Sequence, residues 1–212
     1  MPEKGLFIVF EGPDRAGKTT QARKLAAYLQ SRGIETVHTR EPGGTPFAEA
    51  IRSILLDPCH KVAPSAELLL YEAARAQHTQ QLVRPALAAG KAVLSERYTM
   101  STVAYQGYGR GLDLKLVNRL NKAATGGLRP DLTLVFLMPD KRFSQRSLHI
   151  AADRLELEGA RFRRKVRAGY RRAAAGDARA VVINADRSIE AISAEIITLV
   201  SALKAVKRMV KT

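Results

Sequence analysis

Eight residues near the N-terminus constrain what this chain can fold into more than any other feature. They read Gly12-Pro13-Asp14-Arg15-Ala16-Gly17-Lys18-Thr19 and match the pattern G-x-x-x-x-G-K-[ST]. An apolar run over residues 6–10 precedes the pattern, and a segment with apolar residues at helical spacing, residues 19–32, follows it. A strand, a glycine-rich turn and a helix in this order predict a loop whose backbone N–H groups surround the phosphates of a triphosphate.

Short apolar segments alternate with helix-like segments along the rest of the chain. The predicted strands are residues 5–11, 35–39, 91–95, 131–138 and 180–184. This alternation predicts the α/β class, with a five-stranded parallel sheet between two helical layers. Apolar residues at helical spacing over residues 189–203 predict a closing helix that packs on the sheet. At 212 residues, the chain is expected to form one domain over residues 1–212.

The amino-acid composition restricts the cellular compartment and the classes of partner that we expect. The chain has one cysteine, Cys59, so no intramolecular disulfide can form, which favours the cytoplasm. We find neither a signal-peptide pattern nor an apolar stretch of about 18 residues, so we expect a soluble protein with no membrane partner. The formal charge of +15 favours anionic partners, which are either nucleotides or a nucleic acid.

The residue pattern of a strongly basic segment helps to choose between these two classes of partner. Seven of the twelve residues from 161 to 172 are basic, while Phe162, Val166 and Tyr170 recur at every fourth position. A groove for single-stranded nucleic acid would place aromatic side chains on the same face as the charge. We therefore favour a helix with a buried apolar stripe and a solvated basic face, and nucleic acid is not an expected partner.

Six segments, in this order and spacing, resemble the thymidylate kinases, and the resemblance covers nearly the whole chain. They are FEGPDRAGKTT at 10–20, TREPGGT at 39–45, YEAAR at 71–75, ERY at 96–98, AYQGYGRG at 104–111 and RPDLT at 129–133. The resemblance implies a three-layer P-loop kinase fold and transfer of a phosphate from ATP to dTMP, with Mg²⁺ as cofactor. It also implies a homodimer, because members of the family are typically homodimers.

The resemblance assigns ATP to the phosphate-binding loop and to a lid at about residues 141–154. The implied ATP-binding residues are Gly12, Pro13, Asp14, Arg15, Ala16, Gly17, Lys18, Thr19, Thr20, Arg146 and Arg154. The lid match is weak, because the segment has no glycine. Arg15 lies in the loop, where some members carry the arginine that stabilises charge in the transition state. We therefore expect Arg15 and Lys18 to be catalytic.

The acceptor nucleotide is implied to lie across the sheet edge from ATP. Arg40 and Arg97 follow two predicted strands, and two guanidinium groups suit a phosphate dianion. The family pattern adds Tyr71 stacked on thymine, with Arg75, one helical turn later, bonded to a ring carbonyl. The implied dTMP-binding residues are Asp14, Arg40, Tyr71, Arg75, Arg97, Thr102 and Gln106. Asp14 is implied to accept a hydrogen bond from the sugar 3′-hydroxyl.

One position departs from the family pattern at the implied metal site. Glu96 stands where the family usually has Asp before the arginine. It keeps the carboxylate but is one methylene longer, and we expect it to act with Arg97 in catalysis and to hold Mg²⁺ through water, beside the Thr19 hydroxyl.

Two alternative functions stay open at this point. A kinase for another nucleoside monophosphate, such as dUMP or a guanine nucleotide, would use the same loop, since a stacked aromatic tolerates any base. A basic P-loop ATPase that binds nucleic acid would also explain the charge and Lys18. It gives no reason for one set of residues to occur together: Arg40, Tyr71, Arg75, Arg97, Thr102 and Gln106.

Overall fold

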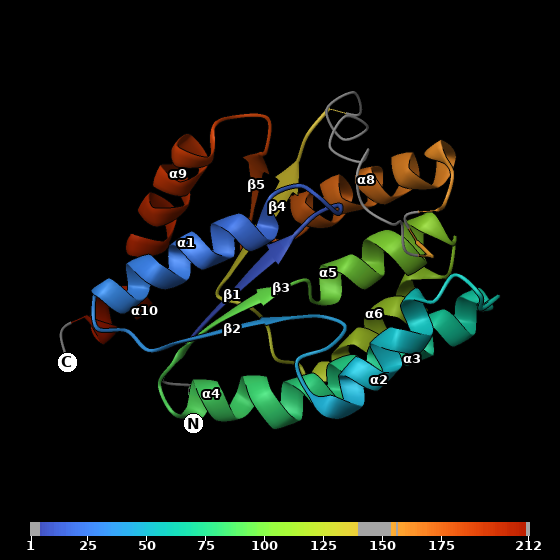
Figure 1. The fold of residues 1–212 in the computed structure, drawn as a ribbon, viewed down its shortest axis with the longest axis horizontal. Coiled ribbons are helices and arrows are strands. Elements are labelled where there is room, and N and C mark those ends of the chain that lie inside the picture. Colours follow the sequence, from blue (N-terminus) through green and yellow to red (C-terminus); the bar gives the residue numbers. More distant parts are fainter. Residues whose placement is uncertain (1–4, 140–153, 156, 211–212) are drawn as a thin grey trace.

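A parallel sheet of five strands forms the centre of the molecule in the computed structural model, which describes residues 5–139, 154–155 and 157–210 (Figure 1). The strands are β1 (Leu6–Glu11), β2 (Thr36–Arg40), β3 (Ala92–Glu96), β4 (Leu132–Leu137) and β5 (Ala180–Asn184). Their spatial order is β2-β3-β1-β4-β5. The predicted strands and their parallel arrangement are confirmed, and their bounds agree within one residue.

Helices connect the strands and cover the sheet. They are α1 (Lys18–Ser31), α2 (Pro46–Leu56), α3 (Pro64–His78), η1 (Thr79–Val83), α4 (Arg84–Ala88), α5 (Thr99–Thr102), η2 (Val103–Gly109), α6 (Leu114–Thr125), α8 (Ala160–Ala175), α9 (Ile189–Ser201) and α10 (Lys204–Met209). The two η segments are π-helical and continue the α-helices that precede them. The expected closing helix ends at Ser201, and α10 follows it.

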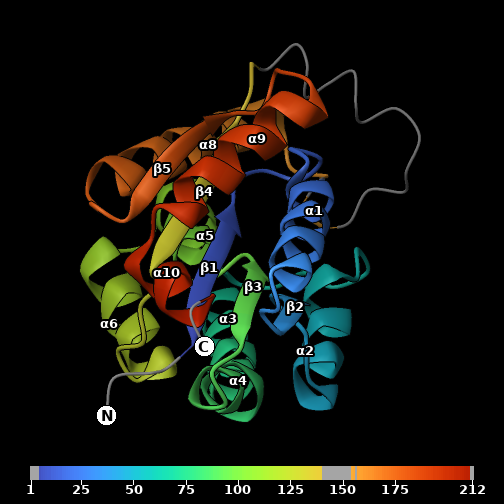
Figure 2. The same ribbon diagram turned by 90° about the vertical axis from the view of Figure 1, so that its left-hand side faces the viewer.

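The helices form a layer on each side of the sheet, as two perpendicular views show (Figures 1 and 2). On one face, α1, α9 and α10 pack on the sheet through a core that includes Phe10, Leu25 and Ile196. On the other face lie α4, η1, α5, η2 and α8. The three-layer α/β/α architecture is thus confirmed. None of the described helices is both long and apolar enough to cross a membrane.

The basic segment folds as the sequence predicts. It forms α8, and Val166 and Tyr170 are buried in a core cluster that Phe162 contacts. Arg161 and Arg164 are among the basic residues that lie exposed on the opposite side. The predicted apolar stripe and solvated basic face are confirmed.

The carboxyl ends of three neighbouring strands meet at one edge of the sheet. β1 ends at Glu11, directly before the glycine-rich loop, β2 ends at Arg40 and β3 ends at Glu96. The strand register pairs Phe10 with Glu96, and Arg40 with Glu96. The loop, Arg40 and the segment that begins at Glu96 are therefore brought together, at the edge where parallel sheets bind ligands.

Candidate functional site

The glycine-rich loop wraps around the amine of its own lysine. Gly12 has φ 128°, and a Cβ added there would lie 2.4 Å from the Phe136 carbonyl oxygen, so only glycine fits. Gly17, with φ 92°, leads into the N-terminus of α1. Lys18 Nζ donates hydrogen bonds to the carbonyl oxygens of Gly12 (3.0 Å) and Pro13 (2.7 Å). The loop thus presents backbone N–H groups, a helix N-terminus and a cation at one place, which is the chemistry of a phosphate site.

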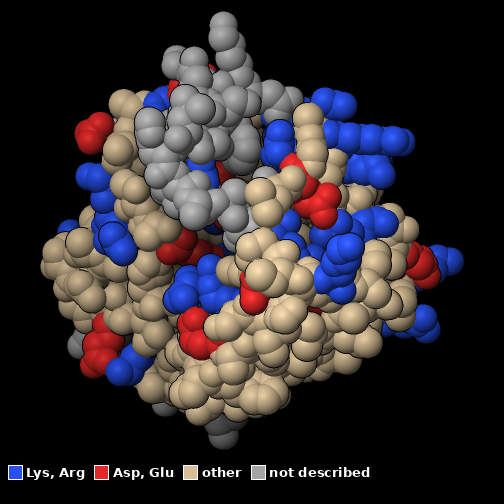
Figure 3. Space-filling view, turned by 45° about the vertical axis from the view of Figure 1, so that its right-hand side comes forward, with Lys and Arg blue, Asp and Glu red and all other residues tan. Residues whose placement is uncertain are grey.

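A cavity of about 430 Å³ opens over this loop. It is lined by Asp14, Arg15, Gly17, Lys18, Thr19, Thr20, Arg40, Glu41, Arg52, Glu96 and Arg97. Arg40 and Arg97 therefore reach the same space as Lys18. In the space-filling view, basic and acidic side chains lie side by side around a hollow on this face of the molecule (Figure 3). The cationic lining suits phosphates on both sides of the hollow.

Thr19 and Glu96 place two side-chain oxygens next to each other beside the loop. Thr19 Oγ1 donates a hydrogen bond of 2.5 Å to Glu96 Oε2, and His38 Nε2 lies 2.9 Å from Glu96 Oε1. Partial burial raises the pKa of Glu96, but the hydrogen bonds from His38 and Thr19 outweigh it and hold the pKa below its usual value. Glu96 is therefore ionised at neutral pH.

A hydroxyl and a carboxylate are the donor types that Mg²⁺ prefers in nucleotide sites, where waters and phosphates complete its shell. The described residues contain no cluster of three or more His, Cys, Asp or Glu side chains arranged to hold a metal ion. The donor set therefore fits a Mg²⁺ ion that arrives with the nucleotide, and it does not fit a metal held by protein side chains alone.

A second, narrow cavity of about 50 Å³ adjoins the first. Tyr71, Thr102 and Gln106 line it. It shares the lining residues Asp14, Glu41, Arg52 and Arg97 with the phosphate-loop cavity. The sheet edge thus offers two adjacent spaces, one beside the phosphate loop and one beside aromatic and amide side chains.

Arg97 joins the two spaces and is held by four side chains. Its guanidinium donates to Asp14 Oδ1 (2.6 Å), Ser101 Oγ (3.1 Å), Tyr170 Oη (2.9 Å) and Tyr105 Oη (3.3 Å). Burial raises the pKa of Asp14, but the charges of Arg97 and Lys18 outweigh it and hold the pKa well below its usual value. Arg97 and Asp14 are therefore both charged and fixed in orientation before any ligand binds.

Comparisons with known proteins agree on one family. A sequence profile of the family described as thymidylate kinase matches residues 10–196. The chain belongs to the thymidylate kinase family. The thymidylate kinase of Pseudomonas fluorescens is 47% identical over 207 residues, covering 96% of this chain and 99% of the relative. That of Pelotomaculum thermopropionicum is 46% identical over 198 residues, covering 92% of each chain. The crystal structure of the thymidylate kinase from Ehrlichia chaffeensis superposes with a TM-score of 0.76 at 33% identity, covering 92% of this chain and 98% of that one.

Arg75 lies deeper in this thymidylate kinase than a direct contact with a base would suggest. It is 2% exposed and does not line either cavity over the sheet edge. Its guanidinium donates to Glu41 (2.8 Å), Glu72 (3.0 Å), Thr102 (2.7 Å), Asn121 (2.8 Å) and the Tyr98 carbonyl oxygen (2.9 Å). Arg75 thus holds Thr102 in the wall of the second, narrow cavity, and the hydrogen bond to a base carbonyl stays a prediction.

The remaining arginines that were predicted to bind ligands differ in whether they line the phosphate-loop cavity. Arg40 lines the phosphate-loop cavity but is half-exposed and paired with Glu49 at 3.0 Å. Arg154 pairs with Glu67 at 2.7 Å and donates to the Leu55 carbonyl oxygen at 2.7 Å, outside the lining of that cavity. Contact between Arg154 and ATP would require it to leave these partners, and it stays a prediction. Arg146, with the rest of the expected lid at 141–153, lies outside the described residues.

Sequence reasoning missed several residues of this site. Arg52 lines both cavities, and Tyr105 and Tyr170 bind Arg97 through their hydroxyls. Tyr105 belongs to the family segment at 104–111, which was a signal that the site includes it. Tyr170 comes from the apolar stripe of α8, and His38 from the middle of β2, and no local pattern marks either as part of a site.

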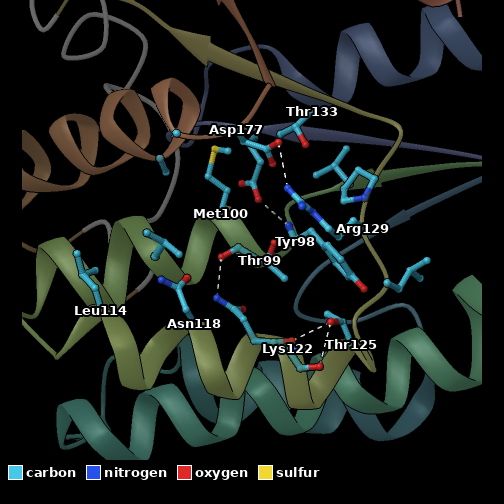
Figure 4. A pocket seen from close by; sticks show the side chains of 18 of the residues that line it. Tyr98, Thr99, Met100, Leu114, Asn118, Lys122, Thr125, Arg129, Thr133 and Asp177 are labelled. Carbon is cyan, nitrogen blue, oxygen red and sulfur yellow. Dashed lines mark hydrogen bonds and ion pairs between the residues drawn. The ribbon is translucent and has the colours of Figure 1, made fainter. Parts of the chain in front are cut away.

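The largest cavity described in this kinase lies elsewhere. It has a volume of about 650 Å³ and lies between α6, α8 and the sheet, where Asn118, Lys122, Arg129 and Asp177 surround it (Figure 4). Neither Lys18 nor Thr19 lines it. Its larger volume alone is therefore no reason to place the proposed reaction there.

The buried amine of Lys18 leads to a pH prediction. Burial and, to a smaller extent, the charge of Arg97 lower the pKa of Lys18, the charges of Asp14 and Glu96 oppose the shift, and the resulting pKa is about 8. Phosphates of ATP favour the charged amine, so binding takes up a proton once the pH exceeds this pKa. We expect kcat/KM for ATP to fall as the pH rises through about 8, approaching about tenfold per pH unit.

A steady-state pH profile at saturating acceptor measures this effect. Lys24→Ala is the matched control, because Lys24 is an exposed lysine on the same helix, and its profile should follow the wild type. A wild-type kcat/KM that stays flat across the alkaline range would contradict the assignment of Lys18 to the ATP phosphates.

Proposed function

We propose that this thymidylate kinase transfers the γ-phosphoryl group of ATP to the phosphate of dTMP, giving dTDP. One observation carries the proposal: the cavity over the phosphate-binding loop is also lined by Arg40 and Arg97, and it adjoins the cavity of Tyr71 and Gln106. Two anionic groups can therefore meet between the two spaces. A basic ATPase that binds nucleic acid is not favoured, because it would not need the second cavity.

Positioning and charge stabilisation account for the proposed reaction. Phosphoryl transfer needs the donor and acceptor oxygens in line, and stabilisation of charge spread over the moving group. On the donor side, the loop backbone and Lys18 hold the β- and γ-phosphates, and Arg15 supplies a further cation. On the acceptor side, Arg97 and Arg40 hold the phosphate of dTMP. Asp14 keeps the Arg97 guanidinium in place through their bond of 2.6 Å.

Thr19 and Glu96 are the proposed residues for Mg²⁺. Mg²⁺ neutralises charge on the phosphate oxygens of ATP when it is bound. The Thr19 hydroxyl would bind the ion directly, and the ionised Glu96 carboxylate would hold its water shell. The short hydrogen bond between these two side chains supports the assignment, because it places both oxygens at one point beside the loop.

The second cavity is the proposed site for the nucleoside of dTMP. Tyr71 offers a ring for stacking, while Thr102 and Gln106 are buried polar groups of the same lining. Arg75 acts in this proposal by orienting Thr102, to which its guanidinium donates a hydrogen bond of 2.7 Å. A carboxylate beside the sugar, Asp14, would favour a free 3′-hydroxyl.

A coupled assay of ADP release across a panel of monophosphates tests the function. We expect dTMP to give the highest kcat/KM, at least about tenfold above dUMP, since loss of one buried methyl costs roughly that factor. Purine monophosphates should be slower still, because a larger base must enter the narrow acceptor cavity. Highest turnover with a guanine nucleotide would assign the enzyme to another acceptor. ATP hydrolysis that DNA stimulates without any monophosphate would favour the nucleic-acid alternative.

We propose further that the enzyme acts in the cytoplasm as a homodimer. Exposed apolar side chains on α2, α3 and α6 support a dimer, since α3 contacts both other helices and a monomer leaves these side chains in water. They are Phe47 and Ile54 on α2, Leu69 on α3 and Leu116 on α6.

A further inference from the structure

The structure offers an explanation for the glutamate at the proposed metal site. Glu96 is one methylene longer than an aspartate, and this methylene adds a rotatable bond to a side chain whose carboxylate is proposed to hold a water shell. A longer side chain loses more conformational freedom when it is fixed, so some contact has to orient it.

Both oxygens of the Glu96 carboxylate have a hydrogen-bond donor. Thr19 Oγ1 donates to Oε2 at 2.5 Å, and His38 Nε2 lies 2.9 Å from Oε1. The two donors come from different elements, α1 and β2, while Glu96 ends β3. With one donor on each oxygen, the plane of the carboxylate is fixed as well as its position.

The strand register explains why His38 is the partner. His38 and Arg40 are two residues apart on β2, so their side chains lie on the same face, and Arg40 is directly beside Glu96. Arg40 turns instead to Glu49, with Nη2 3.0 Å from Oε2. His38 is therefore the β2 side chain that contacts the Glu96 carboxylate. The His38 side chain is 27% exposed, and the Glu96 side chain is 13% exposed. A hydrogen bond in such a half-buried place is only partly replaced by water.

We propose that His38 is a positioning residue, which holds the longer Glu96 side chain so that its carboxylate can support the Mg²⁺ ion of the nucleotide. This rests on the proposed assignment of Thr19 and Glu96 to Mg²⁺. An aspartate at position 96 would be shorter by about one C–C bond, roughly 1.5 Å, and would fall outside hydrogen-bond reach of His38. His38 therefore matters only together with Glu96, and this dependence distinguishes positioning from a general structural role.

The test compares His38→Ala in two backgrounds, the native Glu96 and Glu96→Asp. The readout is the dissociation constant of ATP, measured by calorimetry once with Mg²⁺ and once with a chelator. The value with the chelator divided by the value with Mg²⁺ is the ratio by which the metal strengthens ATP binding. In the native background, His38→Ala should lower this ratio by about tenfold, as loss of outer-shell partners does in metal sites. In the Glu96→Asp background the change should be under about twofold.

Two further variants keep the test specific. His38→Gln retains an N–H donor and should recover part of the ratio. His60→Ala should leave it unchanged, because His60 is a half-exposed histidine that lies 3.6 Å from Asp57, away from the cavity. Thermal unfolding of each variant establishes that the fold is intact.

The possible results distinguish the role of His38 from the assignment of Glu96 to Mg²⁺, on which that role rests. An unchanged ratio in His38→Ala, or an equal loss in both backgrounds, overturns the role of His38. An unchanged ratio in Glu96→Ala overturns instead the assignment of Glu96 to Mg²⁺. A loss confined to the native background, with recovery by His38→Gln, supports the inference.

Discussion

Replacement of Lys18 by alanine is expected to lower kcat/KM for ATP by at least about 10³-fold, while the protein remains folded. The Lys18 amine is the cation that the loop encloses, with hydrogen bonds to the carbonyl oxygens of Gly12 and Pro13. The amine is almost fully buried, and its pKa lies well below the usual value for lysine, so the free protein holds it at a cost in stability. Alanine removes that cost together with the function.

Three measurements together test this expectation. A coupled assay gives the loss of turnover, calorimetry gives the loss of ATP affinity, and a thermal melt should show a midpoint at or above that of the wild type. Lys24 is an exposed lysine six residues further along α1, and the control variant Lys24→Ala should be normal in all three measurements. Wild-type phosphorylation by Lys18→Ala would refute the assignment of the phosphate-binding loop.

The fold follows from local sequence patterns, and so does half of the site. The bounds of four strands could be predicted because each is a short, mainly apolar run between turn-forming residues, whereas in β2 Val37 is the one apolar residue. The loop could be predicted because its chemistry is contiguous in sequence: Gly12, Lys18 and Thr19 lie within eight residues, and the backbone conformation between them places their groups together.

The acceptor side is assembled from contacts that no local pattern reveals. Arg75 and Tyr71 are one helical turn apart, which predicted a shared role, yet Arg75 turns inward. Two buried carboxylates hold it, Glu41 directly after β2 and Glu72 on α3, and only the fold brings Glu41 beside α3. Burial lowers the pKa of Arg75, but these two carboxylates outweigh it and raise the pKa above its usual value. The position of a charged side chain is therefore set by distant charges as much as by its own helix.

The second large effect that we expect comes from substitution of Arg15. Replacement of Arg15 by alanine should lower kcat by about 10³-fold and change KM for dTMP by less than about threefold. Arg15 lines the phosphate-loop cavity with Lys18 and Thr19, on the donor side of the proposed reaction. A cation there contributes most when negative charge spreads over the transferring group, and less to the ground state. Steady-state kinetics with each substrate varied in turn separates the two parameters.

The backbone at Arg15 requires a paired variant. Its φ is 60°, in the left-handed region that costs a residue with a Cβ about 1 kcal/mol and costs glycine nothing. Arg15→Gly should therefore match Arg15→Ala in kcat while being at least as stable, because both remove the guanidinium and only glycine relieves the backbone. Arg23→Ala, an exposed arginine on α1, should leave kcat unchanged. If both Arg15 variants raise KM for dTMP and leave kcat unchanged, Arg15 contributes to binding the acceptor and not to the transition state, and the catalytic arginine must lie elsewhere in the chain.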